Sequence, residues 1–233
     1  MINYITKNWG VILMSDFNLR ELQLKQVEIL TVIKKICEDN EIKFSLFAGT
    51  ALGAIRHNGF IPWDDDVDIV MSRNDYIKFK KVCEKELPNQ YFYQDYHTDP
   101  GFTQCFAKIR DNNTTYIEEG TEDLKMNRGI FVDIFPFDVV PNSYIRRKTQ
   151  YIYACFNLLL SRGKPSTNDG KLMYIITKIL LKSIPKKYHY KIKSICEKKV
   201  LRYKDDKNGE LAELTSTFGL LKKTYPKDLL DSL

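Results

Sequence analysis

Three observations predict an α+β fold for this chain. Residues 19–38 repeat apolar side chains at helical spacing. Between residues 42 and 140, short runs rich in β-branched and aromatic residues alternate with turn residues. From residue 143 onward the spacing is helical again, and lysine and arginine predominate. We therefore expect a mixed sheet flanked by helices, followed by a basic helical region.

Periodicity and turn residues place the expected elements in order. A helix over 19–38 precedes a short strand at 42–47, and Gly49 then turns the chain into a second helix. A strand over 66–71 comes next, and Ser72 can cap the helix that follows it. The remaining elements are a helix at 73–87, strands at 91–96, 104–110, 114–118 and within 129–138, and helices at 143–161, 170–183 and 186–204.

Charge and composition divide the chain into three segments. Residues 1–18 are an N-terminal extension, 19–140 a core of mixed structure, and 141–233 a basic helical region that we expect to pack on the core. Residues 141–204 carry 16 Lys and Arg against 2 Asp and Glu, a net of +14. The five cysteines are scattered without a CxxC pair, which favours a reducing compartment. With no signal-peptide pattern and no apolar run near the roughly 20 residues that span a bilayer, we expect a cytoplasmic location.

Four aspartates fall within five positions: Asp64, Asp65, Asp66 and Asp68. Because alternate side chains of a strand share a face, Asp64, Asp66 and Asp68 are expected on one side and the intervening apolar residues in the core. Two like charges 4 Å apart repel by about 4 kcal/mol at an effective dielectric of 20, so such a face needs cations. Carboxylates without nearby His or Cys suit Mg²⁺ or Mn²⁺, which predicts a metal site for phosphate chemistry.

Three other interpretations of the acidic stretch compete with a metal site. A solvated acidic loop is disfavoured by the apolar alternation after Asp66. A calcium-binding loop would use Asp75 as its twelfth residue, but Ile69 stands where such a loop needs glycine. An N-cap cluster is disfavoured because Ser72 is the better cap for the next helix.

Further polar residues are candidates for the same site. Gly49 would let a ligand approach the backbone, and Thr50 adds a hydroxyl where helix amides attract anions, although a plain strand-to-helix turn has the same pattern. Lys108 and Arg110 are expected on one face of their strand, as holders of phosphate oxygens or as ordinary surface charges. Asp133 is a single charge in an apolar strand. It is therefore either a satisfied core carboxylate or a third acid facing Asp66 and Asp68.

The basic segment 141–204 suggests an anionic partner. A phosphate-bearing polymer, a nucleotide-sugar type of donor and an acidic membrane surface would each suit its charge. A solvated helical face is the plainer interpretation. Nucleic acid also suits the charge, but the sequence shows no recognised nucleic-acid-binding motif.

Three motifs together resemble one family. Gly49-Thr50, the run GAIRHNGFIPWDDDVD at 53–68 and the run FVDIFP at 131–136 closely resemble the LicD/fukutin family of phosphotransferases, a branch of the nucleotidyltransferase superfamily. The resemblance covers residues 19–140 well and the basic helices loosely. It implies a nucleotidyltransferase-like mixed sheet, with residues 19–140 as the catalytic core and residues 1–18 as an extension.

The resemblance also implies a chemistry. Asp66 and Asp68 would bind Mg²⁺ or Mn²⁺, Asp133 would complete the site and act as base, and Asp64 would be an auxiliary ligand. Donor phosphates would be held by Gly49, Thr50, Arg56, Lys108 and Arg110. Such enzymes move phosphocholine or a polyol phosphate from a CDP-activated donor to a hydroxyl of a cell-surface glycan or glycan-phosphate polymer. The competing functions are nucleotidyl transfer to a small molecule and non-catalytic binding of an anionic polymer or of the inner face of a membrane.

One departure from the family pattern concerns the C-terminus. Family members continue with an aromatic and proline-containing segment that helps close the donor site. This chain stops at Leu233, soon after the run KKTYP at 222–226. A truncated or shortened chain is therefore expected.

Overall fold

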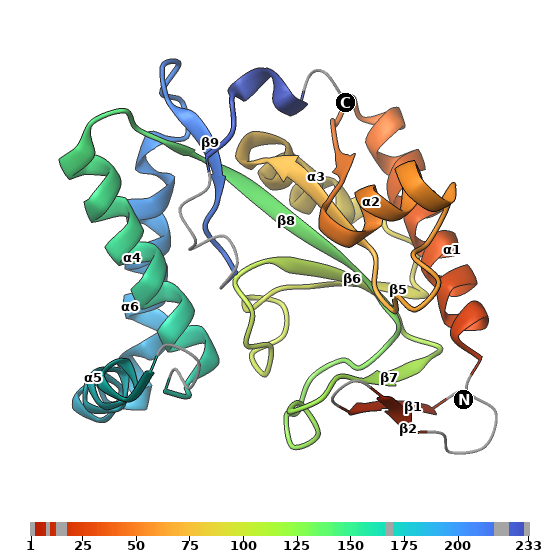
Figure 1. Ribbon diagram of the computed structural model, residues 1–233, viewed down its shortest axis with the longest axis horizontal. Coiled ribbons are helices and arrows are strands. Elements are labelled where there is room, and N and C mark those ends of the chain that lie inside the picture. Colours follow the sequence, from red (N-terminus) through yellow and green to blue (C-terminus); the bar gives the residue numbers. More distant parts are fainter. Residues whose placement is uncertain (1–2, 8–9, 13–17, 166–169, 217–223, 231–233) are drawn as a thin grey trace. The chain divides into compact units, whose positions relative to one another are not determined.

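The computed structural model describes residues 3–7, 10–12, 18–165, 170–216 and 224–230 (Figure 1). The chain forms two compact units. Unit 1 comprises residues 1–102 and 106–135, and unit 2 comprises residues 103–105 and 136–233. The change from one unit to the other falls inside a single strand, β8 (Phe131–Val140).

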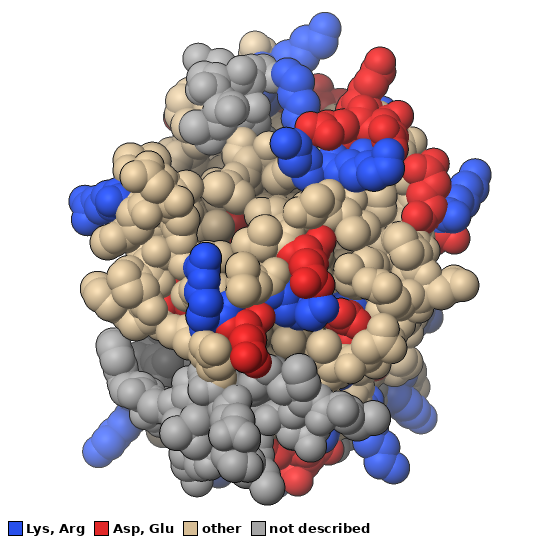
Figure 2. All heavy atoms as spheres, turned by 90° about the vertical axis from the view of Figure 1, so that its right-hand side faces the viewer, with Lys and Arg blue, Asp and Glu red and all other residues tan. Residues whose placement is uncertain are grey.

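The surface carries charges of both signs. On the face shown in Figure 2, Lys and Arg side chains lie next to Asp and Glu side chains. Such a mixture is typical of a face that meets water, and it leaves little net field. Residues 141–204, by contrast, have a net charge of +14 and therefore lack such a balance of positive and negative side chains.

Two sheets are present in the described residues. The smaller has the order β2-β1-β7, in which β1 is antiparallel to β2 and parallel to β7. The larger has the order β3-β4-β8-β6-β5, and a further strand, β9, pairs with the second half of β8. Their bounds are β1 (Asn3–Lys7), β2 (Gly10–Ile12), β3 (Ser45–Leu46), β4 (Asp68–Ser72), β5 (Tyr91–Gln94), β6 (Ala107–Asp111), β7 (Thr115–Ile117) and β9 (Glu210–Glu213).

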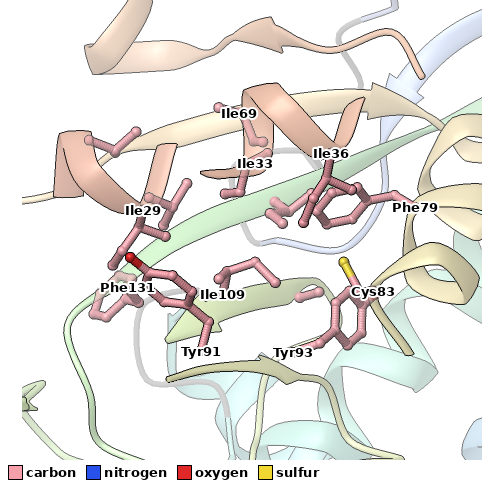
Figure 3. Packing of buried hydrophobic residues seen from close by; sticks show 14 of the residues in the cluster. Ile29, Ile33, Ile36, Ile69, Phe79, Cys83, Tyr91, Tyr93, Ile109 and Phe131 are labelled. Atoms are coloured by element: carbon pink, nitrogen blue, oxygen red, sulfur yellow. The ribbon is translucent and has the colours of Figure 1, made fainter. Parts of the chain in front are cut away.

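Three helices of unit 1 accompany these strands: α1 (Leu19–Asp39), α2 (Ala48–His57) and α3 (Arg73–Glu86). The side chain of Ser72 accepts a hydrogen bond from the backbone N–H of Asp75, so the predicted cap of α3 is confirmed. Apolar side chains of α1 and α3 meet those of β4, β5, β6 and β8 in one cluster (Figure 3). Burying an isoleucine in this way contributes roughly 1.5–3 kcal/mol, so the periodic residues of α1 hold it on the sheet.

Unit 2 contains the basic helices α4 (Tyr144–Arg162), α5 (Gly170–Ser183) and α6 (Lys186–Val200), followed by the short helices η1 (Leu201–Tyr203) and η3 (Lys227–Leu230). Gln150 fixes α4 because its buried side-chain amide donates to the carbonyls of Val139 and Val200, at 2.8 and 2.9 Å. A small apolar cluster around Ala154 and Ala212 lies beside it. Within the described ranges, no helix is long and apolar enough to cross a membrane.

The predicted fold class is confirmed, and the helices begin and end within a few residues of their predicted positions. Several strand predictions are wrong in extent: the strand expected at 91–96 ends at Gln94, and the strand expected at 104–110 begins at Ala107. The strand expected at 42–47 is paired only at Ser45–Leu46, and the strand expected at 66–71 begins at Asp68. Residues 64–67 are irregular, so the strict alternation expected from Asp64 onward does not hold. The extension 1–18 also contributes β1 and β2, which its sequence did not indicate.

Candidate active site

The acidic segment is held by two glutamines of α1. The side-chain amide of Gln23 donates to the carbonyl of Asp64 at 2.9 Å, and that of Gln26 donates to the carbonyl of Asp65 at 2.8 Å. Both glutamines are buried. Side chains of α1 therefore satisfy the carbonyls of Asp64 and Asp65 and hold this part of the acidic segment against the helix. Sequence reasoning missed these residues, although two glutamines three positions apart among the apolar residues of α1 were a visible signal.

Tyr116 of β7 fixes the side chain of Asp65. Its hydroxyl donates to Oδ2 of Asp65 at 2.6 Å. Burial, and then this hydrogen bond, raise the pKa of Tyr116 far above its usual range. The phenol therefore remains a donor at any physiological pH, and it orients a carboxylate next to the predicted metal ligands. This tyrosine was also missed, because a strand tyrosine has no local pattern that marks it as functional.

The start of α2 lies against the acidic segment. A Cβ added at Gly49 would meet Oδ2 of Asp64 at 2.9 Å, so a larger residue there would displace this carboxylate. The left-handed backbone conformation belongs to the preceding residue, Ala48, with a φ of 44°. Thr50 Oγ1 accepts a hydrogen bond from the backbone N–H of Asp68 at 2.8 Å and so ties α2 to the first residue of β4. The donor-phosphate role of Gly49 and Thr50 stays a prediction.

The carboxylates of the segment lie close together and are partly desolvated. Asp64, Asp65 and Asp66 each offer an oxygen, and these oxygens lie within 4.8 Å of one another. Burial, followed by the negative charges of Asp133 and Asp64, raises the pKa of Asp66 to about 7. Burial, followed by the charges of Asp66 and Asp133, raises the pKa of Asp68 to about 8. The structure thus brings acids from two separate segments near enough to oppose one another's ionisation.

Asp133 lies on β8 beside the acidic segment. Its backbone N–H donates to the carbonyl of Val67 at 2.8 Å. Its carboxylate forms an ion pair with Lys108, with 2.9 Å between Oδ1 and Nζ. Burial raises the pKa of Asp133, and Lys108 opposes that rise. Both interpretations of Asp133 therefore apply. It is a core carboxylate with a buried cationic partner, and its charge also raises the pKa of Asp66 and Asp68.

Lys108 and Arg110 are fully buried and share one carboxylate. Glu118 accepts from Lys108 Nζ through Oε1 and from Arg110 Nη2 through Oε2, each at 2.8 Å. Burial opposes the ionised form of Glu118, yet the two cations hold its pKa below the usual range. The ring of Phe131 adds a cation–π contact, with its centroid 3.3 Å from Lys108 Nζ and 4.7 Å from Arg110 Cζ. Sequence reasoning did not select Glu118, which completes this network.

These contacts bear on the phosphate-binding residues expected from the sequence. Lys108 and Arg110 already have carboxylate partners, so they are not the surface charges that the plainer interpretation required. Arg56 is exposed near the C-terminal end of α2. A role for any of the three in holding phosphate stays a prediction.

The donor set fits a hard divalent cation. Every side chain of the cluster offers carboxylate oxygen, the ligand type that Mg²⁺ and Mn²⁺ prefer. Oδ2 of Asp64 is buried and has no hydrogen-bond partner among the described residues. The raised pKa values of Asp66 and Asp68 show that their negative charge is poorly compensated by the protein alone. A cation at the converging oxygens of Asp64, Asp65 and Asp66 would supply compensation there. Asp68 and Asp133 as further ligands stay a prediction.

The fold and the site together define a mixed α/β domain that carries an acidic cluster beside a glycine-containing helix start. Residues 41–157, half of the chain, match the family model described as LicD/FKTN/FKRP, nucleotidyltransferase domain. The chain therefore belongs to the LicD/FKTN/FKRP family, which confirms the resemblance seen in its motifs.

Three similar proteins, one of them a LicD enzyme and two of them uncharacterized, show how far the similarity extends. The chain is 39% identical over 130 residues to the lipopolysaccharide cholinephosphotransferase LicD of Haemophilus influenzae, a match that covers 55% of this chain and 48% of that protein. It is 26% identical over 154 residues to an uncharacterized protein of Rickettsia typhi, covering 61% of this chain and 44% of the relative. It is 30% identical over 80 residues to an uncharacterized protein of Rickettsia prowazekii, covering 32% and 30%. The chain thus spans less than half the length of each of these relatives.

Proposed function

We propose that this protein is a metal-dependent phosphotransferase that moves a phospho-alcohol from a CDP-activated donor to a hydroxyl of a cell-surface glycan or glycan-phosphate polymer. Membership of the family and similarity to a lipopolysaccharide cholinephosphotransferase support the reaction class. The observation that carries the proposal is that Asp133, from a separate strand, lies near enough to the acidic segment to raise the pKa of both Asp66 and Asp68.

Asp66 and Asp68, with Asp64 as auxiliary ligand, would hold Mg²⁺ or Mn²⁺. A bound divalent cation would offset the charge of the donor diphosphate and of the phosphoryl group in transit. The acidic segment needs a fixed shape for this task, and Gln23, Gln26 and Tyr116 provide it. Residues pre-positioned in this way lose less entropy when the donor binds.

Asp133 is the residue that would accept the proton of the acceptor hydroxyl. As the hydroxyl oxygen forms its bond to the β-phosphorus of the donor, the bond from that phosphorus to the CMP oxygen breaks, and CMP leaves with its electron pair. Lys108 holds Oδ1 of Asp133 at 2.9 Å and so fixes the orientation of the base. A base must lie within hydrogen-bond distance of the proton that it accepts. The ion pair with Lys108 limits the positions that the Asp133 carboxylate can take, and so limits where an acceptor hydroxyl can bind.

Product analysis with CDP-choline, CDP-ribitol and CDP-glycerol in the presence of Mn²⁺ tests the proposal. We expect release of CMP, and we expect Asp66→Asn and Asp68→Asn to abolish it while the protein stays folded. Asp123→Asn, which changes an exposed carboxylate, is the matched control and should keep activity. Release of phosphocholine, ribitol phosphate or glycerol phosphate would instead indicate nucleotidyl transfer, because the CMP group would then stay on the acceptor. A protein that binds no Mg²⁺ or Mn²⁺ in the presence of any of these donors would indicate non-catalytic binding.

A further inference from the structure

Helix α5 turns an apolar face toward solvent. Leu172, Ile175, Ile176 and Ile179 follow the spacing i, i+3, i+4, i+7, which places them on one side of the helix. Leu172, Ile175 and Ile179 are 71%, 52% and 59% exposed. Among the described residues of α5, only Thr177 is buried. A stripe of this kind normally packs on a core, so its exposure needs an explanation.

A row of lysines runs along one edge of the apolar stripe. Lys171, Lys178 and Lys182 are spaced i, i+7, i+11, and at 100° per residue they fall beside Ile175 on the helix surface. All three are exposed. The surrounding sequence, residues 170–196, holds seven lysines and neither aspartate nor glutamate. The apolar stripe is therefore bordered by positive charge.

We infer that α5 docks this protein on an anionic lipid bilayer, with the stripe formed by Leu172, Ile175, Ile176 and Ile179 in the boundary between headgroups and acyl chains. A helix of 14 residues is about 21 Å long, short of the roughly 30 Å of a hydrocarbon core, so α5 lies in the plane of the membrane. Apolar residues on one face with lysines beside them are typical of such interfacial helices. The lysine stems lie along the apolar surface while their ammonium groups reach the lipid phosphates.

Charge decides between a bilayer and a second copy of the chain. A symmetric dimer brings the same patch of both subunits together, so pairing through α5 would place lysine-rich segments against each other. Like charges across an interface weaken association. An anionic membrane has the opposite charge, and each lysine near it strengthens binding by about fivefold. The docking of α5 is independent of the proposed reaction, and either can fail without the other.

Vesicle flotation of the full 233-residue chain tests this inference. The probes are vesicles of phosphatidylcholine alone and of phosphatidylcholine mixed with phosphatidylglycerol. We expect binding to the mixed vesicles, and the double variant Ile175→Ser/Ile179→Ser should lower it at least about tenfold, since both side chains lose apolar contact with lipid. The control Leu24→Ser/Val27→Ser removes exposed apolar residues from α1 and should bind like the wild type. Lys178→Glu/Lys182→Glu should lower binding to the mixed vesicles as well.

A spectroscopic measurement guards against variants that bind poorly because they misfold. Ile179→Trp keeps an apolar side chain in the stripe, and bromine-labelled lipid should quench its fluorescence beyond that of the wild-type tryptophans. Absence of wild-type binding, equal binding to both kinds of vesicle, or equal loss in the α1 control would overturn the inference. So would sedimentation analysis that shows a dimer in the wild type and a monomer in Ile175→Ser/Ile179→Ser.

Discussion

The stability of the metal-free protein should fall as pH rises, and Asp68→Asn should reduce this dependence. Asp66 and Asp68 have folded-state pKa values raised to about 7 and about 8, from an ordinary value of 3.8. Between about pH 4 and about pH 8, these two carboxyl groups keep protons in the folded state that they have already released in the unfolded state. The stability that these groups contribute is therefore complete below about pH 4 and is lost as pH rises through about 8. Asparagine at position 68 cannot ionise, so the variant lacks the larger of the two pKa shifts.

The size of the effect follows from the smaller of the two shifts. The charge of Asp66 contributes to the shift of Asp68, so the two shifts should not simply be added. A rise from 3.8 to about 7 is about three pKa units, and at about 1.36 kcal/mol per unit this corresponds to about 4 kcal/mol. For a chain of this length each kcal/mol changes the melting temperature by about 2–4 °C. The wild type should therefore melt about 10 °C lower at high pH than at low pH on account of this site.

Differential scanning calorimetry in the presence of a chelator measures this dependence. The quantity of interest is the difference in melting temperature between wild type and Asp68→Asn, compared at about pH 5 and about pH 8, two values that span most of the titration window. As pH rises, we expect the melting temperature of Asp68→Asn to increase relative to that of the wild type. The melting temperature of Asp123→Asn should change with pH as that of the wild type does. Mn²⁺ should raise the wild-type melting temperature at the higher pH, because a ligand of the folded state stabilises it. If the difference between wild type and Asp68→Asn is the same at both pH values, the carboxylates do not oppose one another as described.

Three further substitutions test the supporting contacts. Glu118→Gln leaves two buried cations without their shared carboxylate and should cost about 3–5 kcal/mol in urea unfolding, whereas the exposed Glu84→Gln should stay within about 0.5 kcal/mol. Gln26→Leu removes the donor to a carbonyl of the acidic segment. It should lower the free energy of unfolding by about 1–3 kcal/mol and weaken Mn²⁺ binding in calorimetric titration. An unchanged Mn²⁺ affinity would show that this hydrogen bond does not position the acidic segment for the cation. Gly49→Ala places a Cβ 2.9 Å from a carboxylate oxygen and should weaken Mn²⁺ binding, while Gly59→Ala, with nothing within 4 Å, should not. Equal affinities in the two glycine variants would show that the close approach is unimportant.

Local pattern was sufficient for the helices and for the identity of the acids. The apolar residues of α1 recur at helical spacing because one face of that helix is buried, and Ile29, Ile33 and Ile36 are indeed in the core. The aspartates were found because four carboxylates in five positions are difficult to explain without a cation. Asp133 was noticed because a lone charge in an apolar strand requires a partner.

Contacts between distant segments could not be read from the same pattern. The carbonyls of Asp64 and Asp65 are met by side chains that lie about 40 positions earlier, on α1, and the carbonyl of Val67 is met by the N–H of Asp133, on β8. The alternation of β6 placed Lys108 and Arg110 on one face but could not show that Glu118 neutralises both in the interior. Burial of a charge is decided by its partner, and the partner belongs to another element.

The continuity of β8 through both compact units has a practical consequence for anyone who wishes to produce the acidic half alone. A shortened polypeptide that ended at residue 140 would retain the whole strand but lose β9, whose backbone pairs with residues 137–140. Those four residues would then present open donors and acceptors along one edge, and such edges recruit strands from other molecules. Fragments that stop there should precipitate or form mixed oligomers, whereas fragments that keep β9 should stay dispersed.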